Sequence, residues 1–188
     1  MSDDTFFNKL QALKANRKDR LQMADRVLQN PLLFPELLQI CYLFEDPVSS
    51  RACWVLELVI ANKPQWLIPC LDEFTLKIKG FILDSSIRPV SKICYQLVKE
   101  YFKKGSRFKN EVDEEHLNRI TATAFDWLIN DEKIAAKGFA IYTLFELGKK
   151  YNWIYPELKY ILEKNMPSES AGYRAAAKKI LSRIAKDS

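Results

Sequence analysis

The feature that most constrains the fold is a helix start that recurs along the chain. The tetrapeptide FPEL at residues 34–37 returns as YPEL at residues 155–158, and IPCL at residues 68–71 is a weaker copy. Proline is tolerated in a first helical turn because its missing N–H would have no partner there. The recurrence predicts several copies of one helical unit.

Each of these helices is followed by a short polar break and a second, more apolar helix. The breaks begin at Asp46, Asp84, Asp131 and Ser168, which places them 38, 47 and 37 residues apart. Asp and Ser side chains at such breaks cap the helix that follows by accepting its first N–H groups. A period of about 40 residues is typical of solenoids built from helical pairs.

Hydrophobic periodicity is helical throughout, and no segment shows the alternation of a strand followed by a hairpin turn. Two short apolar stripes near the start predict a pair of capping helices: Phe6, Leu10 and Leu13 on the first, and Leu21, Ala24 and Leu28 on the second. The long spacing between breaks contains a polar stretch at residues 103–115, which we expect to form an irregular loop.

Two later helices differ in how they must be covered. Residues 52–61 read ACWVLELVIA with Glu57 as the only charge, so this helix must be buried on both sides. The last helix is amphipathic, as a terminal helix with one wet face must be. Its apolar stripe is Tyr173, Ala177, Ile180 and Ile184, and its basic residues are Arg174, Lys178, Lys179, Arg183 and Lys186.

These patterns predict an all-α fold, an α-α superhelix of about four helical hairpins in a HEAT-like solenoid with an N-terminal helical cap. We expect residues 1–188 to form one domain. Within it, residues 1–30 would be the cap, 31–101 the first two repeats, 102–115 a polar inter-repeat loop and 116–188 the last two repeats.

Composition agrees with a folded protein of one domain. Apolar residues make up 48% of the 188 residues and charged residues 28%, with a net charge of +5. No apolar run reaches the roughly 20 residues that cross a bilayer, and the start lacks the pattern of a signal peptide, so we expect a cytoplasmic protein without a membrane partner. The widely spaced Cys41, Cys53, Cys70 and Cys94 are predicted to be reduced core thiols.

The break at residues 46–51, Asp-Pro-x-x-x-Arg leading into an Ala-rich apolar helix, resembles the second helix of a HEAT repeat. Over nearly its whole length the chain resembles a family of short, uncharacterised bacterial helical-repeat proteins, some of which are named adenylosuccinate lyase. The segments that carry this resemblance are SSRACWVLELV, FDWLINDEKIAAKGFAIYTLFELG and WIYPELKYILE. The resemblance implies the helical-repeat fold.

The lyase name implies the flexible SSxMPxKxNP loop that enzymes of the fumarase and aspartase superfamily share. The nearest string here, MPSES at residues 166–170, lacks the Lys and the Asn-Pro. His116 is the only histidine, and at a helix start we expect it to be solvated surface. One His and four separated Cys fit no zinc spacing, so neither a catalytic residue, a metal nor a cofactor is predicted.

The sharpest candidate for binding is the series Arg51, Trp54 and Glu57, a cation, a ring and a carboxylate at intervals of three residues. On a second helix these side chains would line the concave face of a solenoid. The alternative is a core Trp with an ion pair at its boundary. In either case Glu57, among apolar neighbours, must be paired, reach solvent or become protonated.

The polar loop is the second candidate, because its positive charge and one aromatic ring suit contact with phosphate groups. Its cations are Lys103, Lys104, Arg107 and Lys109. The acidic residues that follow, Glu111 and residues 113–115, would partly cancel their field. The alternative is an ordinary solvated loop.

Architecture without a catalytic motif favours a non-enzymatic module that binds another protein on its concave face. The alternative is nucleic-acid binding through a basic surface, in the style of HEAT-like DNA alkylation-repair proteins, supported by the loop cations and the basic last helix. A remote alternative is the adenylosuccinate lyase activity that the family resemblance names. The identity of the partner and the oligomeric state stay open.

Overall fold

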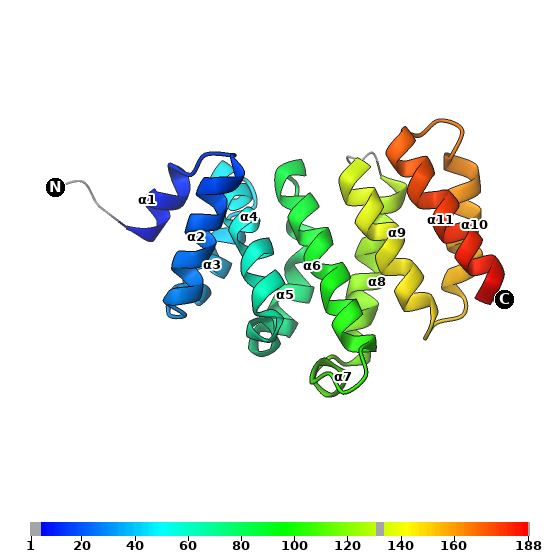
Figure 1. Cartoon of the computed structure of the whole chain (residues 1–188), viewed down its shortest axis with the longest axis horizontal. Coiled ribbons are helices and arrows are strands. Elements are labelled where there is room, and N and C mark those ends of the chain that lie inside the picture. Colours follow the sequence, from blue (N-terminus) through cyan, green and yellow to red (C-terminus); the bar gives the residue numbers. More distant parts are fainter. Residues whose placement is uncertain (1–4, 131–133, 188) are drawn as a thin grey trace. The chain divides into compact units, whose positions relative to one another are not determined.

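The computed structural model describes residues 5–130 and 134–187, and within these ranges the chain is helical with no strand, which confirms the all-α prediction. The helices, labelled in Figure 1, are α1 Phe6–Gln11, α2 Arg17–Gln29, α3 Leu33–Cys41, α4 Pro47–Asn62, α5 Leu71–Lys77, α6 Asp84–Phe102, α7 Phe108–Glu111, α8 Glu114–Ile129, α9 Ile134–Gly148, α10 Ile154–Asn165 and α11 Ala171–Asp187. Two 3-10 segments, Pro64–Cys70 and Ile78–Gly80, flank α5. Among the described helices, none has the length and apolar character needed to cross a membrane.

Contacts along the chain group into two compact units, residues 1–93 and 94–188. The boundary falls inside α6, so the first unit holds α1 to α5 and the start of α6, and the second holds the rest of α6 and α7 to α11. That residues 1–188 form one repeat domain stays a prediction.

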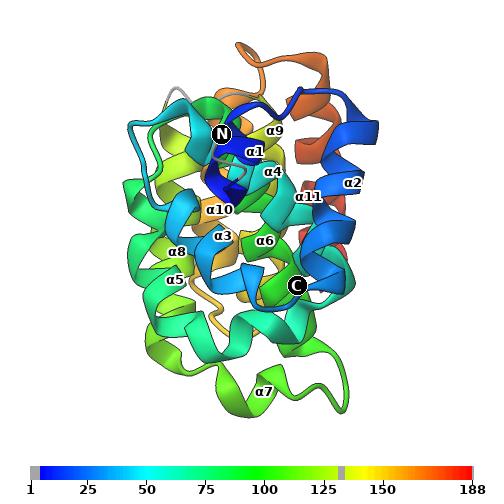
Figure 2. The same ribbon diagram turned by 90° about the vertical axis from the view of Figure 1, so that its left-hand side faces the viewer.

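Helix α4 is the centre of the first unit, with α3 and α5 on one side of it and α2 on the other (Figure 2). Its buried residues run from Val48 to Ile60 and include most of the predicted apolar run, but Trp54 and Leu58 are half-buried and Ala61 is exposed. Helices cover α4 on two sides as expected, and the stripe that holds Trp54 and Leu58 is only partly covered. Asp46 starts it as predicted, because its carboxylate accepts a hydrogen bond from the Val48 N–H at 2.8 Å.

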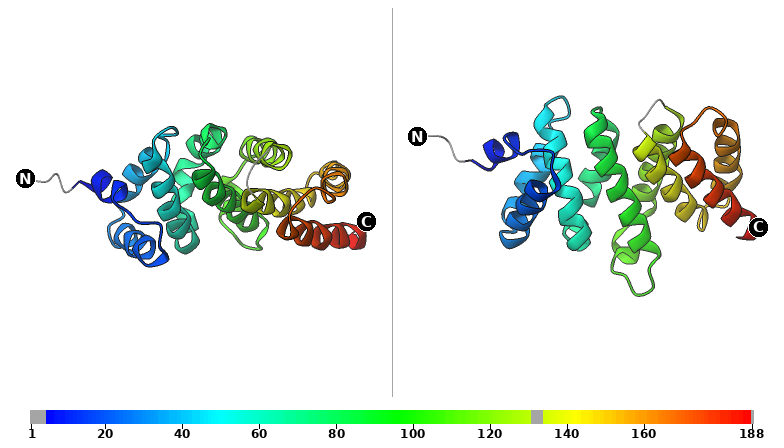
Figure 3. Two further views of the ribbon diagram at one scale, coloured as in Figure 1. Left: turned by 90° about the horizontal axis from the view of Figure 1, so that it is seen from above. Right: turned by 45° about the horizontal axis from the view of Figure 1, so that its top comes forward.

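The second unit has two layers of helices, α8 with α10 and α9 with α11 (Figure 3). Helix α11 buries the predicted stripe of Tyr173, Ala177, Ile180 and Ile184. Ser170 caps it by accepting a hydrogen bond from the Tyr173 N–H at 3.1 Å. The predicted break at residues 131–133 lies outside the described residues.

Three local predictions need correction. Leu21 is 39% exposed, because the residues of α2 that are buried are Ala24, which the predicted stripe includes, and Val27, which it does not. The third copy of the helix start, at residues 68–71, lies at the end of a 3-10 segment, and the α-helix begins only at Leu71. The polar loop is partly ordered, because α7 forms within it and buries Phe108.

Candidate functional site

Side chains from three helices of the first unit converge on a hollow of about 340 Å³, here called the basic hollow. Helix α2 supplies two cations, α4 supplies a ring and a carboxylate, and α6 supplies two further cations. The residues that line the basic hollow are Arg17, Arg20, Trp54, Glu57, Leu58, Arg88 and Lys92. Its volume is at the low end of the range typical of sites for small ligands or single side chains, roughly 300–1,000 Å³.

Glu57 organises one wall of the basic hollow. The residue is 6% exposed, and its carboxylate accepts hydrogen bonds from the Arg88 guanidinium at 3.0 Å and from the Lys92 ammonium at 2.6 Å. Arg88 and Lys92 are four residues apart on α6, so they lie on the same face of that helix. Of the three outcomes expected for Glu57, pairing is the one observed, with partners on a different helix.

Trp54 forms a second wall and is held at its edge. Its indole N–H donates to the Ser85 carbonyl at 3.0 Å, and the guanidinium carbon of Arg20 lies 5.3 Å from the ring centroid. Ser85 is itself tied to α4, because its hydroxyl donates to the Ser50 hydroxyl at 2.7 Å. The cation beside Trp54 is therefore Arg20, and Arg51 is not among the residues that line the basic hollow.

The basic hollow carries an excess of positive charge. In the part of the chain that the structure describes, no carboxylate pairs with Arg17 or Arg20. The neighbouring carboxylate of Asp19 instead accepts a hydrogen bond from the Asn16 side chain at 2.9 Å, next to the N-cap of α2. Four cationic side chains thus share Glu57 as the one carboxylate in the lining. A concave site with this charge attracts anions.

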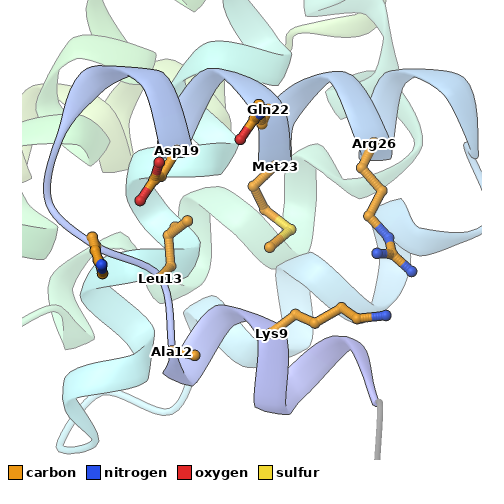
Figure 4. Close-up of a pocket in the computed structure, with 8 residues that line it drawn as sticks. Lys9, Ala12, Leu13, Asp19, Gln22, Met23 and Arg26 are labelled. Atoms are coloured by element: carbon orange, nitrogen blue, oxygen red, sulfur yellow. The ribbon is translucent and has the colours of Figure 1, made fainter.

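A second groove lies between α1 and α2 and has a volume of about 360 Å³. Figure 4 shows Met23 and Leu13 directed into this groove, with Lys9 and Arg26 extending toward its same end. Asp19 and Gln22 also line it, so its charge is mixed. It lacks the convergent hydrogen-bonding groups of the basic hollow, and we regard it as the weaker candidate.

The cations of the predicted loop site, at residues 103–109, do not converge as those of the basic hollow do. The Lys103 ammonium pairs with the Glu100 carboxylate at 3.3 Å, and Lys104, Arg107 and Lys109 are exposed to solvent. The loop belongs to the second unit. Its cations neither converge on a ring nor line one of the described hollows, so the loop remains a candidate on composition alone.

His116 does not lie on the surface as expected. It is 5% exposed and forms a capping box at the start of α8: the His116 N–H donates to the Asp113 carboxylate at 2.9 Å, and the Asp113 N–H donates to His116 Nδ1 at 3.1 Å. In that second bond the imidazole Nδ1 is the acceptor. The hydrogen bond from the His116 backbone lowers the pKa of Asp113. His116 is a capping residue.

In the second unit, the polar side chains of Glu114, Lys150 and Tyr151 form hydrogen bonds with one another. The Glu114 carboxylate accepts hydrogen bonds from the Lys150 ammonium at 2.6 Å and from the Tyr151 hydroxyl. These bonds lower the pKa of Glu114, while burial and the adjacent carboxylate raise the pKa of Tyr151. The groups satisfy one another and join the start of α8 to the segment after α9.

The cysteines are free thiols, of which Cys41, Cys53 and Cys94 are buried and Cys70 is half-buried. Burial raises the pKa of the Cys41 and Cys94 thiols, which keeps them protonated and unreactive. Within the ranges described, no group of His, Cys, Asp and Glu side chains is arranged to hold a metal ion.

Sequence reasoning missed a surface of the second unit on which cations alternate with rings. The Tyr95 and Tyr142 rings are 5.8 Å apart, the Lys99 ammonium lies 5.5 Å from the Tyr95 ring, and the Lys179 ammonium lies 5.9 Å from the Tyr142 ring. Two of these residues come from α6, one from α9 and one from α11. Because each helix supplies only one or two of them, no segment of sequence shows the set.

The paired state of Glu57 predicts a measurable loss of stability when its charge is removed. We expect Glu57→Gln to lower the free energy of unfolding by about 1–2 kcal/mol, because the buried carboxylate makes two charge-assisted hydrogen bonds. The loss is limited because Arg88 and Lys92 are about one third exposed and regain water. Urea denaturation followed by circular dichroism measures it.

A matched control is Glu73→Gln on α5, because the Glu73 carboxylate also accepts two hydrogen bonds, from Lys77 and from Gln39, but is 40% exposed. A pair that solvent reaches to this extent contributes less than about 1 kcal/mol. Equal losses in the two variants would mean that the burial of Glu57 adds nothing to its ion pairs.

Comparisons of the chain with protein-family models, with curated proteins and with solved structures give no match. The arrangement of the chain's own residues therefore carries the functional inference.

Proposed function

We propose that this protein is a non-enzymatic interaction module that binds an acidic segment of another protein in the basic hollow. The observation that carries the proposal is the convergence of Arg17, Arg20, Arg88 and Lys92 around a half-buried Trp54, with Glu57 as the one carboxylate in the lining. Charge-assisted hydrogen bonds favour the binding of anions, and Glu57 already orients two of the four cations, Arg88 and Lys92, toward the hollow.

The proposed architecture is a HEAT-like solenoid of about four helical hairpins with an N-terminal cap. It is supported by the recurring helix starts at residues 34–37 and 155–158 and by the two helical layers of the second unit. In such a solenoid the second helices of the pairs line one face, and α4 and α6 are second helices in this scheme. The proposal therefore assigns the basic hollow to the recognition face of this solenoid.

Two properties of the basic hollow favour a protein partner over a nucleic acid. The hollow has a volume of about 340 Å³, whereas a nucleic-acid strand needs a basic surface that follows several phosphate groups. Trp54 has Arg20 over its ring, so it is less available for stacking with a base. An acidic side chain that enters between Arg20 and Lys92 fits the limited volume and does not need to stack on Trp54.

The proposal is tested by capture of partners from a native lysate, with a variant of α2 that removes the unpaired cations. We expect Arg17→Ala/Arg20→Ala to lower the amount of partner captured at least about tenfold, because each charge-assisted hydrogen bond contributes roughly 1.5–3 kcal/mol. Mass spectrometry of the eluate, with and without nuclease, measures the change.

The matched control is Lys18→Ala/Arg26→Ala, which removes two cations from the same helix outside the basic hollow. Both variants are first shown to be folded by circular dichroism. Capture that is equal for the wild type and the Arg17/Arg20 variant would reject the basic hollow as the binding site.

Nucleic-acid binding is the second candidate, favoured by the alternating cations and rings around Tyr95 and Tyr142 on the second unit. The capture experiment described above distinguishes nucleic-acid binding from binding of an acidic protein segment. Nucleic acid in the eluate, with protein partners lost after nuclease and with affinity that falls steeply as salt is raised, would favour it. Adenylosuccinate lyase activity stays the remote alternative and is tested by fumarate release from adenylosuccinate.

A further inference from the structure

The net charge of the basic hollow indicates which chemical class of ligand it binds. Glu57 offsets one of the four cations, and it takes one hydrogen bond from Arg88 and one from Lys92. A guanidinium has five N–H donors and an ammonium has three, so both side chains keep donors for a ligand. The site therefore presents an excess of about three positive charges together with several oriented donors.

A phosphate monoester matches this site better than a carboxylate does. At neutral pH it carries a charge of roughly −1.5 to −2 and three strong acceptor oxygens, whereas a carboxylate carries one charge and two oxygens. Arginine is the side chain suited to bidentate contact with phosphate, and three of the four cations are arginines. A single carboxylate would leave much of the positive charge in the hollow uncompensated.

The donors on two walls are held in place before any ligand binds. Glu57 fixes Arg88 and Lys92, the Ser85 carbonyl fixes the Trp54 ring, and that ring in turn supports Arg20. Side chains that are already ordered lose less conformational entropy on binding, which raises affinity. In this arrangement Glu57 and Trp54 are positioning residues, and the cations are the groups that contact the ligand.

We infer that the basic hollow binds the phosphate of a phosphorylated serine or threonine side chain in the partner protein. The inference rests on the proposed function and specifies its ligand. The hollow of about 340 Å³ admits a phosphorylated side chain, and Arg20 lies over one face of the Trp54 ring, which favours a side chain over a stacked nucleotide base.

The first experiment is a titration of the full chain with small phosphate and carboxylate compounds, followed by NMR of the Trp54 indole N–H. The signal is assigned among the four tryptophans by its loss in Trp54→Phe. We expect N-acetyl-O-phosphoserine amide to shift this signal and to bind at least about fivefold more tightly than N-acetylaspartate amide. Equal affinities, or no shift with the phosphoserine compound, would overturn the inference.

The pH dependence of this binding separates a dianion from a carboxylate. A phosphate monoester has a second pKa of about 6, so if only the dianion binds, affinity falls about tenfold between pH 7.5 and pH 5.0. Sulfate, which keeps its charge over this range, is the control for titration of the hollow itself, whose charged groups are Arg17, Arg20, Glu57, Arg88 and Lys92. Parallel losses for both ligands would overturn a preference for the dianion.

Adenosine 5′-monophosphate distinguishes the source of the phosphate. We expect it to bind no more tightly than the phosphoserine compound, because Arg20 already lies over one face of Trp54, the one ring in the lining. A clear preference for the nucleotide would assign the site to nucleotides or to the ends of nucleic acids and would overturn the assignment to a phosphoprotein.

Variants connect these results with capture of the partner. Arg20→Ala is expected to weaken phosphoserine binding at least about tenfold, and Lys18→Ala/Arg26→Ala to leave it within twofold. Phosphatase treatment of the lysate should abolish capture. Capture that resists phosphatase but is lost in Arg17→Ala/Arg20→Ala would overturn the phosphate inference and leave the acidic-partner proposal standing, whereas capture that resists both would reject the proposed function as well.

Discussion

Replacing Phe145 by alanine is expected to lower the free energy of unfolding by about 3–5 kcal/mol, the range found for large rings removed from a packed core. Phe145 on α9 is fully buried, its ring is 5.7 Å from the Tyr155 ring, and the Arg183 guanidinium lies 4.1 Å from its centroid. The substitution removes contacts with both α10 and α11. Urea denaturation followed by circular dichroism measures the loss.

The control for this variant is Phe139→Ala, on the same helix. Phe139 is half-buried, and its ring is 6.3 Å from that of Tyr95. Because part of its ring already meets water, we expect a loss of less than about 2 kcal/mol. Similar losses at both positions would contradict the difference in burial that separates the two faces of α9.

Gly148→Ala is expected to destabilise the protein by about 2–3 kcal/mol through steric conflict. A methyl group added at Gly148 would lie 2.1 Å from Cε1 of Tyr155, and this ring cannot move freely because it stacks on Phe145. Overpacking of this kind forces side chains from their preferred rotamers or shifts the backbone. The φ angle of Gly148 is not positive, so the expected cost comes from the contact and not from the backbone.

Gly138→Ala, ten residues earlier on α9, is the matched control with the opposite sign. A methyl group there would meet nothing within 4 Å. Alanine in a helix interior is favoured over glycine, so we expect a gain of about 0.4–1 kcal/mol. A gain at both positions would mean that the Tyr155 ring yields easily and that α9 and α10 are not tightly packed at this point.

Stability measurements are also needed to interpret the capture experiments with the α2 variants. If the α2 variants unfold as the wild type does, a loss of capture reports on the basic hollow and not on the fold. Glu57 is the one residue that links the two properties, since it stabilises the first unit and positions Arg88 and Lys92. For this reason the binding tests use substitutions on α2, whose cations line the hollow without serving Glu57.

The sequence by itself determined the helical class and much of the local architecture. The helix starts after the breaks that begin at Asp46 and Ser168, the buried stripe of α11 and the packing of helices on two sides of α4 were all predictable, because capping and hydrophobic periodicity depend on residues close together in the chain. The need of Glu57 for a partner was predictable too, since a carboxylate among apolar neighbours is costly to bury alone.

Only the tertiary structure decided which residues meet. Arg20 from α2 lies over Trp54 in place of Arg51, and α6 supplies both partners of Glu57. His116 is buried, although its local sequence suggested an exposed helix start. The physical reason is the same in each case: helical periodicity tells which residues share a face, but the rotation and packing of each helix against its neighbours decide what that face touches.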